Sequence, residues 1–109
     1  MRLNQKYVLH IPLFKYDGSE LIPLDEKSIV DGILSKLNEN EYENLYITKV
    51  KGIYKKRCFD ELLITLFVES KSQDTPKVIF KKWFKENNNI LKQKELAYEY
   101  NNTLIIEEV

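Results

Sequence analysis

The sequence predicts an α+β domain of the ferredoxin-like kind, with the element order strand, helix, strand, strand, helix, strand (βαββαβ). Three observations carry this prediction: an alternating apolar pattern near the start, two amphipathic helical segments, and an apolar run over residues 62–68. The 109 residues, 43% of them hydrophobic, are enough to bury a core without disulfides. We therefore expect residues 1–109 to form a single domain, with two helices on one face of an antiparallel sheet.

The first strand is predicted over residues 5–15. Apolar side chains at odd positions from Tyr7 to Leu13 alternate with a second set at even positions, which is typical of a strand with two different faces. Pro12 has no amide hydrogen for the ladder, so we expect it at an edge, a bulge or the end of the strand. Residues 17–19 have the composition of a turn.

Two helices are predicted, one after Pro23 and one from Pro76 to about Asn88. Asp25 is a suitable N-cap for the first helix, and Thr75 followed by Pro76 suits the start of the second. Spacings of three and four give each helix one apolar face for the core. These faces consist of Ile29, Val30, Ile33, Leu34 and Leu37 in the first helix, and Ile79, Phe80, Trp83 and Phe84 in the second.

The remaining strands are predicted over residues 45–54 and 61–69 and in the tail. Residues 62–68 are apolar at both odd and even positions, which is typical of a central strand. The tail, residues 95–108, has two possible structures. Asn101 and Asn102 tolerate positive φ and favour a hairpin with an extra C-terminal strand, and one long bent strand is the alternative.

Charge and cysteine content indicate the compartment and limit the partners. The formal net charge is zero, whereas tight non-specific nucleic-acid binding usually needs a basic domain. Cys58 is the only cysteine, and we expect it to pack as a small apolar residue. No apolar run is long enough to span a bilayer. We therefore expect a cytoplasmic protein that does not associate with membranes.

The sequence contains no recognisable catalytic motif. One histidine and one cysteine are too few for a typical zinc site, and no glycine-rich phosphate loop is present. We expect no metal, no cofactor and no catalytic residue, which favours a non-enzymatic role without deciding it. Seven carboxylates could line the sheet ends, although caps and turns account for their positions: Asp17, Glu20, Asp25, Glu26, Asp60, Glu61 and Glu69.

The sheet face away from the helices is predicted to bind protein. Apolar and aromatic sheet faces rarely stay exposed to water, and tyrosine is enriched at interfaces. We therefore expect a non-enzymatic interaction module, an accessory, regulatory or inhibitory subunit, that acts through this face or an edge strand. Its expected partner is a second copy, forming a homodimer, or a larger protein. The candidate residues are Val8, His10, Phe14, Tyr46, Tyr54, Tyr98 and Tyr100.

Nucleic-acid binding or processing is the alternative function, and a small-molecule sensor is the third. Residues 49–59 combine basic and aromatic side chains, and aromatics on a ferredoxin-like sheet can stack on bases. The basic residues of this segment are Lys49, Lys51, Lys55, Lys56 and Arg57, accompanied by Tyr54 and Phe59.

The opening of the chain resembles small uncharacterised bacterial α+β proteins of one domain. These begin with a strand that ends in Ile-Pro-Leu, followed by an Asp-Gly turn. The corresponding residues here are Ile11-Pro12-Leu13 and Asp17-Gly18. The resemblance covers mainly the first twenty residues and implies no known activity.

Overall fold

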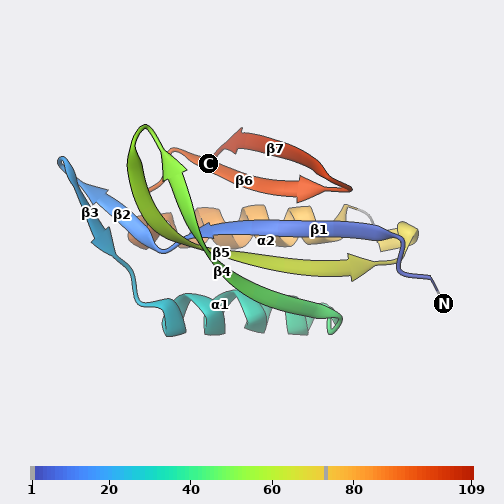
Figure 1. Cartoon of the computed structure of the whole chain (residues 1–109). Coiled ribbons are helices and arrows are strands. Elements are labelled where there is room, and N and C mark those ends of the chain that lie inside the picture. The colour runs from blue at the N-terminus through green and yellow to red at the C-terminus, as the bar shows by residue number, and fades with distance from the viewer. Residues whose placement is uncertain (1, 73) are drawn as a thin grey trace.

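The computed structural model describes residues 2–72 and 74–109, which form a five-stranded antiparallel sheet with helices against one face and a separate two-stranded hairpin (Figure 1). The order of strands across the main sheet is β4-β5-β1-β6-β7, and β2 pairs with β3. The strands are β1 Gln5–Pro12, β2 Phe14–Asp17, β3 Glu20–Pro23, β4 Leu45–Tyr54, β5 Arg57–Val68, β6 Glu95–Tyr100 and β7 Thr103–Glu108. The helices are α1 Glu26–Glu39, the 3-10 turn η1 Ser70–Ser72, α2 Thr75–Glu86 and α3 Asn88–Leu91.

The core lies between the main sheet and the helices. From β1, the alternating residues Tyr7, Leu9 and Ile11 face the helices and are almost fully buried. The register places them opposite apolar residues of β5, so that whole rows of side chains point into the core. Each such buried side chain contributes about 1.5–3 kcal/mol relative to an exposed one. The helices add Ile29, Ile33 and Leu37 from α1, and Phe80, Trp83 and Phe84 from α2.

The structure confirms the α+β class and the antiparallel sheet, whereas the plain βαββαβ order does not describe the chain. The predicted first strand over residues 5–15 is interrupted, because β1 ends at Pro12. The next amide, of Leu13, donates to the carbonyl oxygen of Asp60 at 3.1 Å, and the chain then turns away from the sheet. The residues that follow form the β2–β3 hairpin, whose turn includes Gly18 at φ 64°.

The tail forms the hairpin rather than the long bent strand. Asn101 and Asn102 have φ values of 47° and 71°, the left-handed values that a tight two-residue turn needs. The turn is also bonded to β1: the Asn101 amide donates to the Lys6 carbonyl at 2.9 Å, and the Lys6 amide donates to the Asn101 side chain at 2.8 Å. As a result β7 extends the main sheet beyond β6.

The helix starts are close to the predicted ones. Asp25 takes the N-cap position of α1, although its side chain makes no capping hydrogen bond, and the N-cap residue of α2 is Asp74 rather than Thr75. Pro76 lies in the first turn of α2, where a missing amide hydrogen costs nothing. Of the helices in the described ranges, none has the length and apolar content needed to cross a membrane.

The turn between β4 and β5 is predicted to be a site of local strain. Lys55 and Lys56 have φ values of 49° and 65°, a conformation that costs most L-residues free energy. Replacing both by Asn-Gly should therefore raise the free energy of unfolding by about 1 kcal/mol. Urea denaturation of the variant against the native chain measures the difference.

The matched control is Lys55→Ala with Lys56→Ala, which removes the same charges but keeps both Cβ atoms. It should not stabilise the protein. Equal stabilisation by both variants would attribute the effect to charge and contradict the backbone explanation.

Candidate functional site

A pocket of about 780 Å³ opens at one end of the main sheet. Its walls come from segments far apart in the chain: the β2–β3 hairpin, the tip of the β4–β5 hairpin, the residues before β6, and β1. Figure 1 shows the two hairpins gathered at this end of the molecule. Pockets of this size hold small molecules, so this is the candidate site.

One wall of the pocket is aromatic. The ring of Phe14 packs 4.7 Å from that of Phe59 and meets Tyr16 edge-on at 5.4 Å, measured between ring centroids. Arg57 covers Tyr16 from outside, 6.0 Å from its ring centre, and donates to the Ser19 carbonyl oxygen at 3.1 Å. These contacts connect the β2–β3 hairpin to β5 and give the pocket a wall of aromatic rings.

Gly52 makes room for this wall. It lies opposite Phe59 in the β4–β5 ladder, and the Phe59 ring rests over it. A Cβ atom on Gly52 would lie 2.4 Å from the Phe59 ring and 3.1 Å from Oε2 of Glu61. The first distance is shorter than any ordinary contact, so only glycine leaves this ring where it is.

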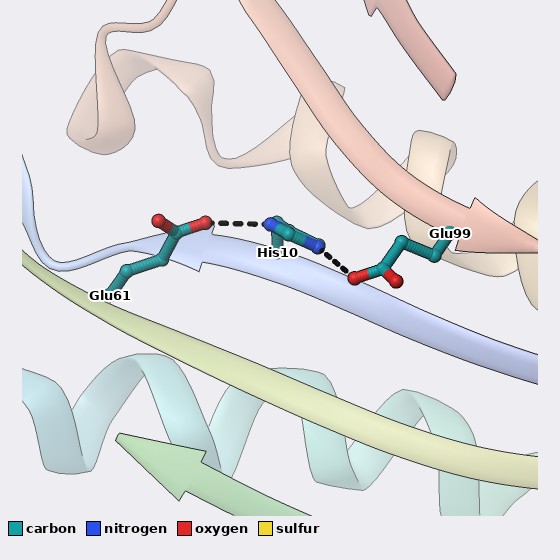
Figure 2. Close-up of polar contacts among 3 residues, drawn as sticks. All are labelled: His10, Glu61 and Glu99. Carbon is teal, nitrogen blue, oxygen red and sulfur yellow. Dashed lines mark hydrogen bonds and ion pairs between the residues drawn. The ribbon is translucent and has the colours of Figure 1, made fainter. Parts of the chain in front are cut away.

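The polar part of the site is a charged trio of His10, Glu61 and Glu99 (Figure 2). His10 comes from β1, between β5 and β6. Its Nδ1 lies 2.9 Å from Oε1 of Glu61, and its Nε2 lies 2.7 Å from Oε2 of Glu99. Glu61 is opposite Pro12 in the ladder and Glu99 is opposite Val8, so the ring reaches both carboxylates along diagonals.

The geometry of the trio favours the charged form of His10. A neutral imidazole donates from only one nitrogen, whereas here both nitrogens face a carboxylate. Partial burial of the ring works against the charge, but the hydrogen bonds to Glu61 and Glu99, and then their negative charges, outweigh it and raise the pKa of His10 above its usual value of 6.5.

Glu61 is the member of the trio that lines the pocket together with His10. Its Oε1 is bonded to His10, and its side chain is 18% exposed. Among the described residues, Oε2 has no hydrogen-bond partner. Sequence reasoning assigned Glu61 to a set of carboxylates at caps and turns. No sequence signal singles it out, since its relation to His10 depends on the pairing of β1 with β5.

Two residues predicted for the protein-binding face, Tyr98 and Tyr100, lie on the opposite face of the sheet, toward the helices. The register sets Tyr98 beside Leu9 and Tyr100 beside Tyr7, which faces the helices. Tyr98 is 1% exposed, and burial, together with the charge of Glu107, raises its pKa to about 12. The assignment was wrong because the face of a short strand depends on its partner's register.

The other predicted residues of that face lie in different places. Val8, His10 and Tyr46 are on the sheet face away from the helices, since Val8 and Tyr46 both pair with Thr65. Phe14 belongs to β2 and lies in the aromatic wall of the pocket. The side chain of Tyr54 lies outside the described part of the chain.

The basic residues predicted for nucleic-acid binding do not form one patch. The register places Lys49 and Lys51 on the helix-facing side of β4, while Lys55 and Lys56 occupy the hairpin turn. Lys49 pairs with Glu26 at 3.3 Å and Lys51 with Asp60 at 2.5 Å, and Arg57 donates to the Ser19 carbonyl.

Cys58 is exposed on the outer part of the β4–β5 hairpin, so the expectation that it packs as an apolar residue was wrong. Within residues 2–72 and 74–109, no group of three or more His, Cys, Asp or Glu side chains could hold a metal ion.

Comparisons with known proteins give two similar solved structures. No family model matches the chain, and no curated protein matches it. A phage SAM lyase solved in complex with S-methyl-5'-thioadenosine has a TM-score of 0.66 at 13% identity, covering 96% of this chain and 89% of that chain. A phage SAM lyase in the apo state has a TM-score of 0.65 at 13% identity, covering 100% of this chain and 94% of that chain. At this identity the likeness shows a common fold.

These structures contradict the predicted function. Both are structures of a lyase, which is an enzyme, and this points away from a non-enzymatic interaction module. The expected homodimer or larger protein partner stays a prediction. The resemblance of the first twenty residues to small bacterial proteins likewise stays a prediction.

The charged trio predicts how stability depends on pH. Because the folded-state pKa of His10 is raised, its contribution is complete below the unfolded value of 6.5 and is lost as pH rises through the folded value. The free energy of unfolding should therefore fall as pH rises from about 6.5 through the raised folded-state pKa of His10, measured by urea denaturation at several pH values.

His10→Gln provides the comparison, since the chain has no other histidine and the N-terminal amine titrates in both proteins. The variant should be less stable at the acidic end and should show a smaller decline. Parallel curves for the two proteins would contradict the role assigned to His10.

The fit between Gly52 and Phe59 also predicts a measurable coupling. Gly52→Ala should lower the free energy of unfolding by about 1–3 kcal/mol, because the Phe59 ring must move. In a chain that already carries Phe59→Leu, Gly52→Ala should cost less free energy than it does in the native chain. Additive effects in the double-mutant cycle, measured by denaturation, would mean that the two residues do not interact.

Proposed function

We propose that the pocket binds a sulfonium nucleoside of the S-adenosylmethionine type and that the chain cleaves it as a lyase. One observation carries the proposal: a chain with the fold of phage SAM lyase has a pocket that combines an aromatic wall with a carboxylate. One of the similar structures is a complex with S-methyl-5'-thioadenosine, which is S-adenosylmethionine without its amino-acid carbon chain.

The size and the aromatic wall of the pocket support a nucleoside ligand. A volume of about 780 Å³ is within the range of small-molecule sites. Phe14, Tyr16 and Phe59 offer ring faces and edges on which a purine can stack, and such stacking contributes about 1–3 kcal/mol per base.

Glu61 supports the choice of a sulfonium ligand. A positively charged sulfur is attracted to a carboxylate in a partly desolvated pocket and to aromatic faces. Oε2 of Glu61 is close to Gly52 and the Phe59 ring, so both kinds of partner are available in one region. We assign Glu61 the role of binding and orienting the sulfonium group.

This role follows the chemistry that a lyase needs here. When S-adenosylmethionine yields S-methyl-5'-thioadenosine, the bond between sulfur and the amino-acid carbon chain breaks, and both electrons remain on sulfur. The carbon that loses sulfur forms a bond to the substrate's own carboxylate oxygen, which closes a lactone ring, so that no external water or base is consumed. The sulfonium becomes a neutral thioether. Glu61 would therefore hold the charged substrate more tightly than the neutral product, which favours product release.

The finer description of the fold belongs to the same proposal. With the β2–β3 hairpin and β7 left out, the remaining order is strand, helix, strand, strand, helix, strand, and this supports an elaborated ferredoxin-like fold. We also propose a cytoplasmic location, where a free thiol such as that of Cys58 stays reduced.

Incubating the purified chain with S-adenosylmethionine tests the function directly. Mass spectrometry should detect S-methyl-5'-thioadenosine accumulating in proportion to the amount of protein. At substrate concentrations below the KM, Glu61→Gln should reduce the rate by about 100-fold, because the loss of the charge that holds the sulfonium weakens substrate binding and raises the KM.

The matched control is Glu39→Gln, the same change on the exposed surface of α1, away from the pocket. It should leave the rate unchanged. Binding of both nucleosides without cleavage would refute the lyase activity and retain the ligand class. Failure to bind either nucleoside, measured by calorimetry, would refute the whole proposal.

A further inference from the structure

We propose that His10 is a positioning residue that holds the Glu61 carboxylate in one orientation, with Oε2 available to the ligand. This inference rests on the proposed function for its ligand, but the arrangement of the three side chains can be tested without any ligand. Glu99 is the outer support: it does not line the pocket and acts only by holding the His10 ring.

The argument begins with the two ends of the imidazole ring. A carboxylate bonded to a freely rotating partner can take many orientations, and ordering it costs rotamer entropy. Here the ring is fixed at both nitrogens, at 2.9 Å to Glu61 and 2.7 Å to Glu99. The bond to Oε1 therefore comes from a donor that cannot swing, and this leaves Oε2 as the oxygen for the ligand (Figure 2).

The surroundings of His10 make this pair of contacts specific. The residues directly opposite His10 are apolar, Leu63 on β5 and Ala97 on β6. Glu61 and Glu99 are therefore the charged groups that these two neighbouring strands present to the ring. Further charged residues on the pocket lining are Lys92, Lys94 and Glu95.

The proton on His10 controls the arrangement. Neutral imidazole has one N–H, so loss of the proton leaves one of the two carboxylates facing a lone pair. The ring is then held at one end only, and the orientation of Glu61 becomes loose. Ligand affinity should therefore decrease as pH rises through the titration of His10, although the same step makes the pocket more negative.

Binding titrations of S-adenosylmethionine at several pH values distinguish a positioning role of His10 from the electrostatic effect of its charge on the ligand. Affinity of the native chain should fall about tenfold across the His10 titration, an effect typical of residues that orient a binding group. Proton NMR follows the same titration directly, because the chain has a single histidine. An affinity that rises with pH, or stays constant, would overturn the proposal.

Two variants sharpen the test. His10→Gln should bind about tenfold more weakly than the native chain at acidic pH and show no pH dependence in this range. Glu99→Gln keeps the His10–Glu61 contact but removes one charge, so the NMR midpoint and the binding midpoint should shift together to lower pH. A shift of the NMR midpoint alone would show that His10 supports the fold without positioning Glu61.

A ligand-free measurement separates this inference from the proposed function. If the native chain binds neither S-adenosylmethionine nor S-methyl-5'-thioadenosine, the proposed function fails. The carboxyl ¹³C signal of Glu61 should still change at the His10 midpoint in the native chain and not in His10→Gln. A Glu61 signal that ignores the His10 titration would overturn the positioning role.

Discussion

The register of β1 is the constraint on which both the core and the candidate site depend. On one face, Tyr7, Leu9 and Ile11 pack against the helices, and on the other His10 lies between carboxylates of β5 and β6. A shift of one residue would turn each of these side chains to the opposite face. The apolar core therefore also fixes where the charged trio forms, because burial of the odd positions leaves His10 no other direction.

The point at which β1 ends determines where the β2–β3 hairpin begins. Pro12 cannot continue the ladder, so the chain leaves the main sheet and enters the β2–β3 hairpin. An isolated hairpin of this length is marginally stable in water. Here the contact of Phe14 with Phe59, and a hydrogen bond from Gln93 to the Phe14 carbonyl at 2.9 Å, connect it to the rest of the molecule. The aromatic wall thus stabilises the hairpin that also forms one side of the pocket.

Much of the fold could be predicted from local patterns. Both long helices and their apolar faces follow from spacings of three and four, and Asn101-Asn102 indicated the tail hairpin as one of two options. The β2–β3 hairpin was missed, because strands of four residues are too short to show a period. Tyr98 was assigned to the wrong face, because alternation separates two faces without saying which one meets the helices.

By itself, the sequence determined the α+β class, the positions of the helices and the apolar strands of the core, since these depend on residues close together in the chain. Only the tertiary structure decided the site. His10 lies 51 residues from Glu61 and 89 from Glu99, and no local pattern relates positions so far apart. Their meeting depends on the pairing of β1 with its two neighbours, which is a property of the whole sheet.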